Sequence, residues 1–128
     1  MSTLAAMRVV HFEVFAKDAA RAIRFYSELF QWNFESDPNH EGYWHIRTGP
    51  KDAPGIDGGL TAPYIDGHGV GIGAWVATVQ VEDLSPFAEK IAGAGGTIVK
   101  QPFEIEGYGR MLHARDPEGN LFGVIEKR

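Results

Sequence analysis

The chain has 128 residues, of which 44% are hydrophobic and 12% aromatic. That length suits a single domain that buries its own core. Because the chain has no cysteine, disulfides, thiolate metal sites and cysteine nucleophiles are excluded. The net charge is −5 with scattered basic residues, so nucleic acid is not an expected partner. Since no apolar run reaches the ~18–20 residues of a membrane span and the first residues lack a signal-peptide pattern, we expect a cytoplasmic protein without a membrane partner.

The first half of the chain has the pattern of strand, helix and three further strands. Residues 7–16 alternate in polarity, which predicts a strand with an apolar face and a second face that carries His11, Glu13 and Phe15. Asp18 is placed to cap a helix whose apolar positions recur every three or four residues up to Phe30. Shorter strand-like runs follow at residues 32–36, 43–48 and 58–61. This order predicts a βαβββ module over about residues 7–63.

The second half repeats that order after a glycine-rich stretch at about residues 64–73. The glycines of this stretch alternate by two and match no phosphate-binding loop, so a connector is expected. A strand at 75–81 precedes a helix that Asp83 or Ser85, followed by Pro86, is placed to cap. Further strands are predicted at 97–100, 110–115 and 121–125, the last two joined by a β-turn at 116–119. A second βαβββ module is therefore expected over about residues 74–128, within one domain of residues 1–128.

The two halves are related as an internal repeat. A shift of 65 residues places Asp18 on Asp83, His11 on Val76 and Gly58 on Gly123. Two such modules predict an α+β fold whose mixed sheets form a curved, half-open barrel. Its inner face is expected to carry the residues of one strand parity, namely His11, Glu13, Phe15, Val76, Thr78 and Gln80.

Three segments carry a resemblance to a known family. They are His11–Asp18, the helix Ala22–Trp32, and Asp116–Asn120 before the last strand. Together they resemble the vicinal oxygen chelate superfamily, which includes glyoxalase I, extradiol dioxygenases, and bleomycin and fosfomycin resistance proteins. The resemblance spans nearly the whole chain. It implies a glyoxalase-like fold and a homodimer, with the modules paired either within one chain or across two.

The resemblance also allows the family's metal site to be compared with this sequence. Metal-dependent members hold a divalent ion with one ligand from the first and one from the last strand of each module. His11 matches such a position, whereas Val76 and the glycines at or beside 58 and 123 offer no donor. A catalytic zinc usually has about three protein ligands, so no metal cofactor is predicted. A rearranged ligand set stays open, in which His45 or His113 joins His11 and Glu13.

Two residues are candidates for catalysis. His11 and Glu13 lie two apart on one strand and so point to the same side, where a carboxylate beside an imidazole orients it for proton transfer. The structural alternatives are a polar pair that only orients a ligand, or the vestige of a lost metal site. Five further residues are expected to contact a substrate: Phe15, Val76, Thr78 and Gln80 on the inner face, and Arg110, which could hold a carboxylate.

The sequence therefore favours a protein that binds a small organic molecule in the sheet cavity without the family's usual divalent metal. It would either sequester that molecule, as bleomycin resistance proteins do, or move a proton with His11 and Glu13. The alternative is a divalent-metal lyase, isomerase or dioxygenase that resembles glyoxalase but has a rearranged ligand set. A third interpretation is an interaction module whose cavity is filled by side chains.

Overall fold

The structure, a computed structural model, describes residues 7–63, 75–105 and 107–127. The predicted connector at 64–73 lies outside these residues. The chain divides into two compact units. The first unit is His11–Trp75, and the second unit is Met1–Val10 together with Val76–Arg128. Among the helices of the described ranges, none has the length and apolar character that crossing a membrane requires.

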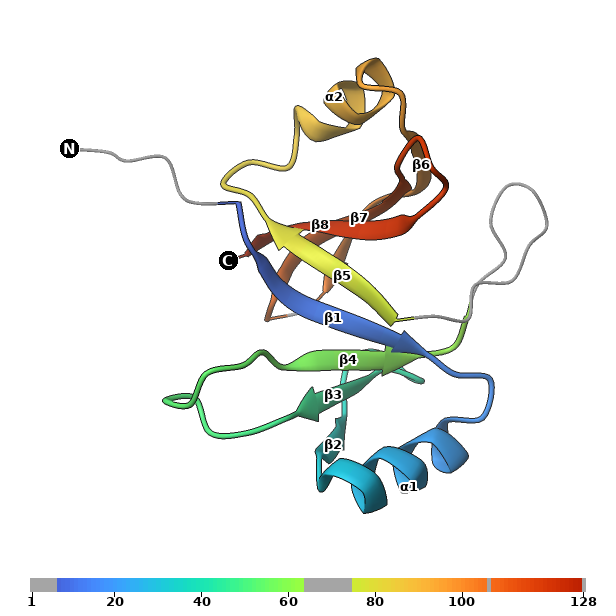
Figure 1. Ribbon diagram of the computed structural model, residues 1–128, viewed down its shortest axis with the longest axis vertical. Helices are drawn as coiled ribbons and strands as arrows, with labels where there is room; N and C mark the ends of the chain where they lie inside the picture. The colour runs from blue at the N-terminus through green and yellow to red at the C-terminus, as the bar shows by residue number, and fades with distance from the viewer. Residues whose placement is uncertain (1–6, 64–74, 106, 128) are drawn as a thin grey trace. The chain divides into compact units, whose positions relative to one another are not determined.

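The first unit contains a four-stranded mixed sheet and one helix (Figure 1). The strands β1 (Val9–Phe15), β2 (Asn33–Ser36), β3 (Trp44–Arg47) and β4 (Gly58–Thr61) are arranged in the order β2-β3-β4-β1. β1 and β4 are parallel, and the other two pairs are antiparallel. Helix α1 (Ala19–Phe30) begins after Asp18, whose Oδ1 accepts a hydrogen bond from the Arg21 N–H at 3.0 Å. The predicted N-cap is confirmed.

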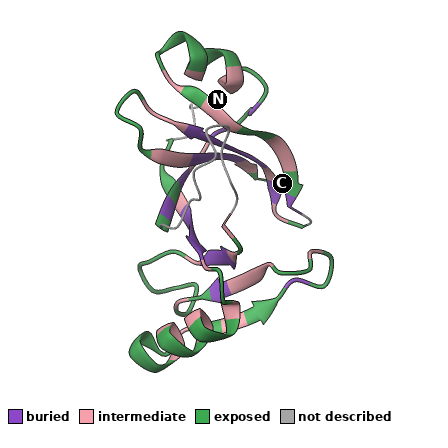
Figure 2. Cartoon of the chain, turned by 90° about the vertical axis from the view of Figure 1, so that its right-hand side faces the viewer, coloured by how far each residue is buried: buried purple, intermediate pink, exposed green. Residues whose placement is uncertain are grey.

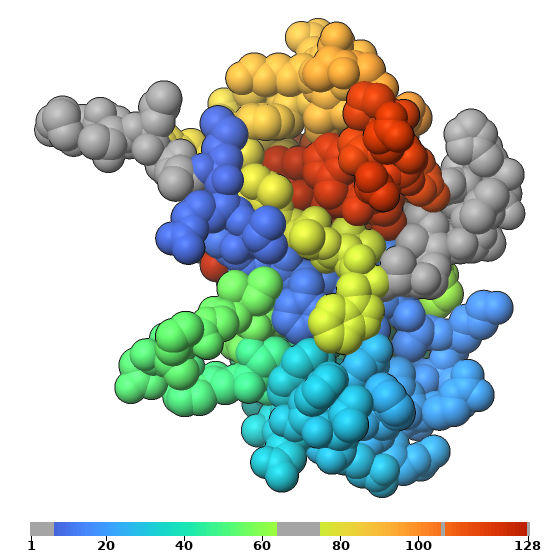
Figure 3. Space-filling view, in the orientation of Figure 1, coloured from blue at the N-terminus to red at the C-terminus, as the bar shows by residue number. Residues whose placement is uncertain are grey.

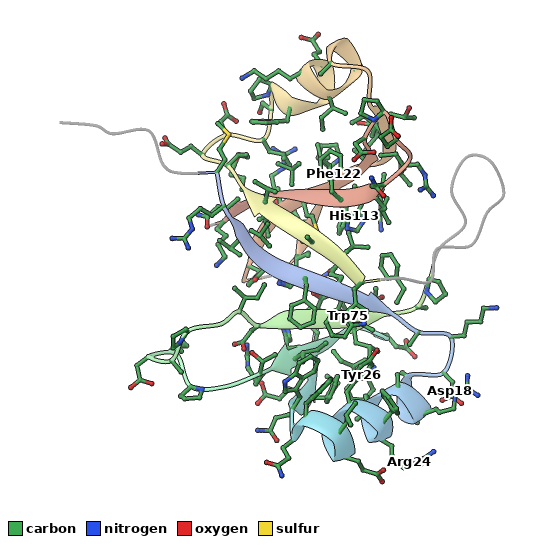
Figure 4. The ribbon with its side chains drawn as sticks, viewed as in Figure 1. Asp18, Arg24, Tyr26, Trp75, His113 and Phe122 are labelled. Carbon is green, nitrogen blue, oxygen red and sulfur yellow. The ribbon has the colours of Figure 1, made fainter. Side chains whose placement is uncertain are left out.

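Helix α1 packs against one face of this sheet. Phe12 and Val14 of β1, with Ile46 and Leu60, form a buried cluster that contacts apolar side chains of α1. The helix itself has no buried residue, as its green and pink colouring shows (Figure 2). Beside this cluster, the labelled side chains of Tyr26 and Trp75 meet, and the Trp75 indole N–H donates to the Tyr26 hydroxyl at 3.0 Å (Figure 4). The residues that alternate with Phe12 and Val14 along β1 point to the opposite face of the sheet.

The second unit has the same composition of elements. Its strands are β5 (Trp75–Gln80), of which all but the first residue belong to this unit, β6 (Thr97–Ile105), β7 (Gly109–Arg115) and β8 (Leu121–Lys127), in the order β5-β8-β7-β6. β5 and β8 are parallel, and the other pairs are antiparallel. Helix α2 (Phe87–Gly93) contributes Phe87 and Ile91 to a cluster around buried Leu112 and Val124. The turn between β7 and β8 forms as predicted, with the Gly119 N–H donating to the Asp116 carbonyl at 2.9 Å.

The predicted fold class, α+β with two βαβββ modules, is confirmed. Two local predictions need correction. The N-cap of α2 is Pro86 and no side chain caps this helix, because the Asp83 carboxylate instead accepts from the Ser85 N–H at 3.0 Å. Strand β6 extends to Ile105, five residues beyond its predicted end at Lys100.

Candidate functional site

His11 and Glu13 lie on the face of the first unit's sheet that is opposite α1. Phe12 and Val14 alternate with them along β1 and pack against the helix, so strand geometry turns His11 and Glu13 the other way. Both are only 2% exposed, and His11 Nε2 lies 3.6 Å from Glu13 Oε2. The structure thus brings the two residues predicted as catalytic into one buried pair.

Tyr43, at the start of the chain segment leading into β3, adds a third polar group to this pair. Its hydroxyl donates a hydrogen bond to Glu13 Oε2 at 3.0 Å and lies 3.5 Å from His11 Nε2. A hydroxyl that donates to a carboxylate stabilises the charged form. Tyr43 is not among the site residues predicted from the sequence, because its hydrogen bond joins residues 30 positions apart.

The position of Tyr43 depends on Gly59. Glu13 and Gly59 are paired across β1 and β4, and a Cβ atom at position 59 would overlap the Tyr43 hydroxyl oxygen. In the second unit the equivalent pair is Thr78 and Gly123. The repeat therefore matches Gly59 with Gly123, not Gly58 as the shift of 65 residues predicted, because the first module has one residue more between the two paired strands.

Gly59→Ala is expected to move the Tyr43 hydroxyl away from Glu13 and to lower the free energy of unfolding by about 1–3 kcal/mol. The added methyl group occupies the space of the hydroxyl and breaks its hydrogen bond to the buried Glu13 carboxylate. Chemical denaturation of Gly59→Ala, Tyr43→Ala and the double variant measures this effect. The double variant should lose less than the sum of the two single losses, because the methyl group no longer meets a ring. Strictly additive losses would contradict the contact.

Tyr43 is held in place by the chain between β2 and β3. The Asp37 N–H donates to the Tyr43 carbonyl at 2.8 Å, and Asp37 Oδ2 lies 2.8 Å from His45 Nε2. The His45 ring meets the Tyr43 ring edge-on, with 5.4 Å between centroids. His45 shares the sheet face of Glu13, since both pair with Gly59. The His45 ring therefore packs against the Tyr43 ring, and its Nε2 forms a hydrogen bond with Asp37.

The Asp37 carboxylate is held in its charged form. The backbone N–H of Asn39 is the largest cause that lowers the pKa of Asp37, followed by the hydrogen bond and charge of His45, and then by His40, while burial acts in the opposite direction. The first of these bonds joins Asn39 N to Asp37 Oδ1 at 2.8 Å. The ionised carboxylate of Asp37 thus stabilises the conformation of residues 37–45 through its hydrogen bonds.

Acid is expected to remove the stability that the Asp37 carboxylate contributes. A group whose pKa is lowered by folding stabilises the protein above its unfolded pKa, about 3.9 for aspartate, and loses that contribution as the pH falls through its folded pKa. Thermal unfolding of the wild type and Asp37→Asn between pH 6 and pH 2.5 checks this. The gap in Tm between the two proteins should be widest above pH 4 and should shrink towards pH 2.5. A gap independent of pH would show that the charge of Asp37 does not stabilise the fold.

The second unit presents a related set of residues on one sheet face. Thr78 of β5, Gly123 of β8 and His113 of β7 lie in one row across the sheet, and both side chains are at most 2% exposed. Val76 shares the parity of Thr78 along β5 and is buried, and Gln80 follows at the end of that strand, half-buried. Three of the residues predicted to contact a substrate therefore share one face with His113.

The other two residues predicted to contact a substrate lie elsewhere. Phe15 shares the parity of Glu13 at the end of β1 in the first unit and is 7% exposed. Arg110 alternates along β7 with Met111 and His113, so it points to the side of the sheet opposite His113. Its Nε lies 3.9 Å from the Glu104 carboxylate. The structure does not bring Arg110 to the face of Thr78 and Gln80, and Arg110 has no part in the function proposed below.

The donor positions of a family-type metal site do not fit a metal in this chain. Of the four positions, only His11 has a donor side chain. Val76 has none, Gly59 is overlaid by the Tyr43 hydroxyl, and the space above Gly123 is bounded by Thr78 and His113. Within residues 7–63, 75–105 and 107–127, no three His, Asp or Glu side chains are arranged to hold an ion. The side chains around both glycines instead supply a hydroxyl group each.

Comparison with known proteins agrees with this architecture. Residues 8–124 match the Glyoxalase/Bleomycin resistance protein/Dioxygenase superfamily. The anthracycline biosynthesis protein DnrV of Streptomyces peucetius is 29% identical over 126 residues, which cover 91% of this chain and 46% of that protein. The putative glyoxylase CFP32 of Mycobacterium bovis is 27% identical over 110 residues, 84% of this chain and 41% of that protein. The chain thus spans less than half the length of these curated relatives.

Solved structures show the same fold at low sequence identity. Methylmalonyl-CoA epimerase from Mycobacterium tuberculosis has a TM-score of 0.61 and 19% identity, covering 98% of this chain and 93% of its own. A glyoxalase/bleomycin resistance protein/dioxygenase superfamily member from Vibrio splendidus has a TM-score of 0.59 and 16% identity, covering 96% and 100%. The predicted family is confirmed: the chain belongs to the Glyoxalase/Bleomycin resistance protein/Dioxygenase superfamily.

Proposed function

We propose that this protein binds a small organic molecule without a divalent metal and that Glu13 exchanges a proton with it. One observation carries the proposal. A carboxylate that is 2% exposed accepts a hydrogen bond from Tyr43 at 3.0 Å and lies 3.6 Å from an imidazole. A buried carboxylate is costly unless it is paired, and this one is kept on a sheet face beside two polar side chains.

The chemistry of these three side chains suits proton transfer next to a carbonyl group. Glu13 takes the proton from carbon as that C–H bond breaks, and the electron pair moves onto the carbonyl oxygen of the ligand. An N–H group of His11 can donate a hydrogen bond to the oxygen that gains the charge, while the Tyr43 hydroxyl donates to Glu13. Return of the proton from Glu13 restores the C–H bond, so the cycle needs no oxidant or reductant.

The names of two relatives support an oxygen-bearing organic ligand. One is an anthracycline biosynthesis protein and the other a putative glyoxylase. A thermal-shift screen of ketones, ketoacids and quinones in the presence of EDTA tests binding. A true ligand at about 100 times its Kd adds about 2.7 kcal/mol of stability. Absence of any stabilising compound would contradict the proposal, and stabilisation that EDTA removes would favour the metal-dependent alternative.

The proposal predicts no stoichiometric metal. After dialysis against Zn²⁺, Mn²⁺, Ni²⁺ and Fe²⁺, elemental analysis is expected to give far less than one ion per chain, because His11 has no second or third ligand at the family positions. His11→Ala is the control and should retain the same small amount. About one tightly bound ion per chain, lost in His11→Ala, would overturn the metal-free proposal.

We also propose that two copies of the chain associate. Helix α1 exposes Phe25, Leu29 and Phe30 at 56%, 57% and 49%. In the space-filling view, α1 and the residues that follow it, blue to cyan, form a continuous outer surface of the first unit (Figure 3). Phe25 and Leu29 are four positions apart on α1 and so lie on one side of the helix, and neighbouring exposed apolar side chains favour a protein contact. Light scattering during gel filtration should give twice the chain mass of 14.1 kDa, and Phe25→Glu should shift that mass towards the single chain.

A further inference from the structure

Thr78 carries a buried hydroxyl group that the fold does not use. The residue is 0% exposed, and Thr78 Oγ1 has no hydrogen-bond partner among the described residues. A buried hydroxyl without a partner destabilises a protein, so such groups are uncommon and call for an explanation. A ligand that supplies the missing partner is one such explanation.

The surroundings of Thr78 in the second unit indicate what that ligand is. A Cβ atom at Gly123 would lie 2.8 Å from Thr78 Oγ1 and 3.2 Å from His113 Cδ2, so these two side chains approach each other above the glycine. The His113 ring, labelled in Figure 4, meets the Phe103 ring with 5.8 Å between centroids and 60° between planes. Lys100 Nζ lies 4.1 Å from the centroid of Phe103.

We propose that Thr78 donates a hydrogen bond to a carbonyl oxygen of a planar aromatic ligand, which lies against His113 and Phe103. This inference rests on the proposed binding of a small organic molecule and names its class. Two adjacent rings favour a planar partner, since offset and edge-on ring contacts are favourable. The hydroxyl of a β-branched side chain is held in few rotamers and suits a fixed acceptor. The ammonium group of Lys100 further favours a ligand with a negative charge.

The inference is tested with two compounds that differ only at carbon 9, which is a ketone in 9-fluorenone-2-carboxylate and a CH2 group in fluorene-2-carboxylate. Calorimetric titration measures both against the wild type and Thr78→Val. The wild type is expected to bind the ketone about two- to tenfold more tightly, the effect of one hydrogen bond. Thr78→Val has the same shape without the hydroxyl and is expected to bind the two compounds equally.

The ligand-free protein gives an independent readout. Thr78→Val is expected to raise the Tm by about 2–4 °C, because a methyl group replaces an unpaired buried hydroxyl. A lower Tm would show that the hydroxyl is hydrogen-bonded within the fold and would overturn the inference. A ketone preference that persists in Thr78→Val would also overturn it.

The outcomes separate this inference from the proposed function. Binding of both compounds without a ketone preference in the wild type removes the role of Thr78 but leaves the binding of organic molecules standing. No binding of either compound overturns the aromatic ligand class. If the wider screen of ketones, ketoacids and quinones also yields no ligand, the proposed function falls with it.

Discussion

Leu112→Ala is expected to lower the free energy of unfolding by about 2–5 kcal/mol. Leu112 is 0% exposed and lies in the cluster through which the second unit's sheet packs against α2. Truncation removes buried methyl groups and leaves a cavity. The cavity closes only if the neighbouring side chains of Val81, Leu84 and Val124 move inward. Urea denaturation followed by circular dichroism measures this loss. The urea concentration at the midpoint of unfolding is expected to fall, while the slope of the unfolding free energy against urea concentration stays unchanged.

Leu112→Met is the matched control for that substitution. Methionine keeps nearly the same volume at the same position, so its cost is expected to stay below about 1.5 kcal/mol. If both substitutions cost the same, the loss does not come from a cavity and the packing of Leu112 against the α2 side of the sheet is contradicted. A much lower slope for Leu112→Ala would instead indicate that the second unit unfolds separately from the first.

The strands and helices were predictable because their signals are local. The alternating polarity of residues 7–16 predicts the strand that these same residues form, β1. Asp18 likewise predicts the start of the helix that follows it, α1, and both elements form as predicted. Strand β6 is longer than predicted, because it continues through Pro102 to Ile105. The structure accommodates this proline at an edge strand, where the pairing with β7 shifts register between Lys100 and Phe103.

The candidate site was only partly predictable. The pairing of His11 with Glu13 follows from a spacing of two residues on one strand. The bond from Tyr43 to Glu13 joins residues 30 positions apart, and it depends on a register in which Gly59 makes room for the hydroxyl. A single sequence holds no signal for such a register. The direction of Arg110 was not predictable in the same way, because the strand parity of β7 turns it to the sheet face opposite His113.

Glu13→Gln is expected to slow the incorporation of solvent deuterium into a bound carbonyl compound by about 10²- to 10⁴-fold, the usual contribution of a positioned general base. Glutamine has the size of glutamate and keeps an oxygen that accepts the Tyr43 hydrogen bond. It has no basic oxygen that can take a proton from carbon. The measurement is the loss of the ligand's C–H signal in proton NMR spectra recorded in D₂O, with a compound that the thermal-shift screen identifies.

Two comparisons decide what the deuterium result means. Glu35→Gln makes the same chemical change on the same sheet, but the Glu35 side chain is 63% exposed and paired with Arg47, so this variant should exchange at the wild-type rate. Ligand affinity should change little in Glu13→Gln, because the substitution removes a base and keeps the shape of the site. If the wild type binds the ligand but exchanges no deuterium beyond the rate in buffer, Glu13 is no base towards that ligand. The His11–Glu13–Tyr43 group would then serve recognition alone, and the protein would hold its ligand without converting it.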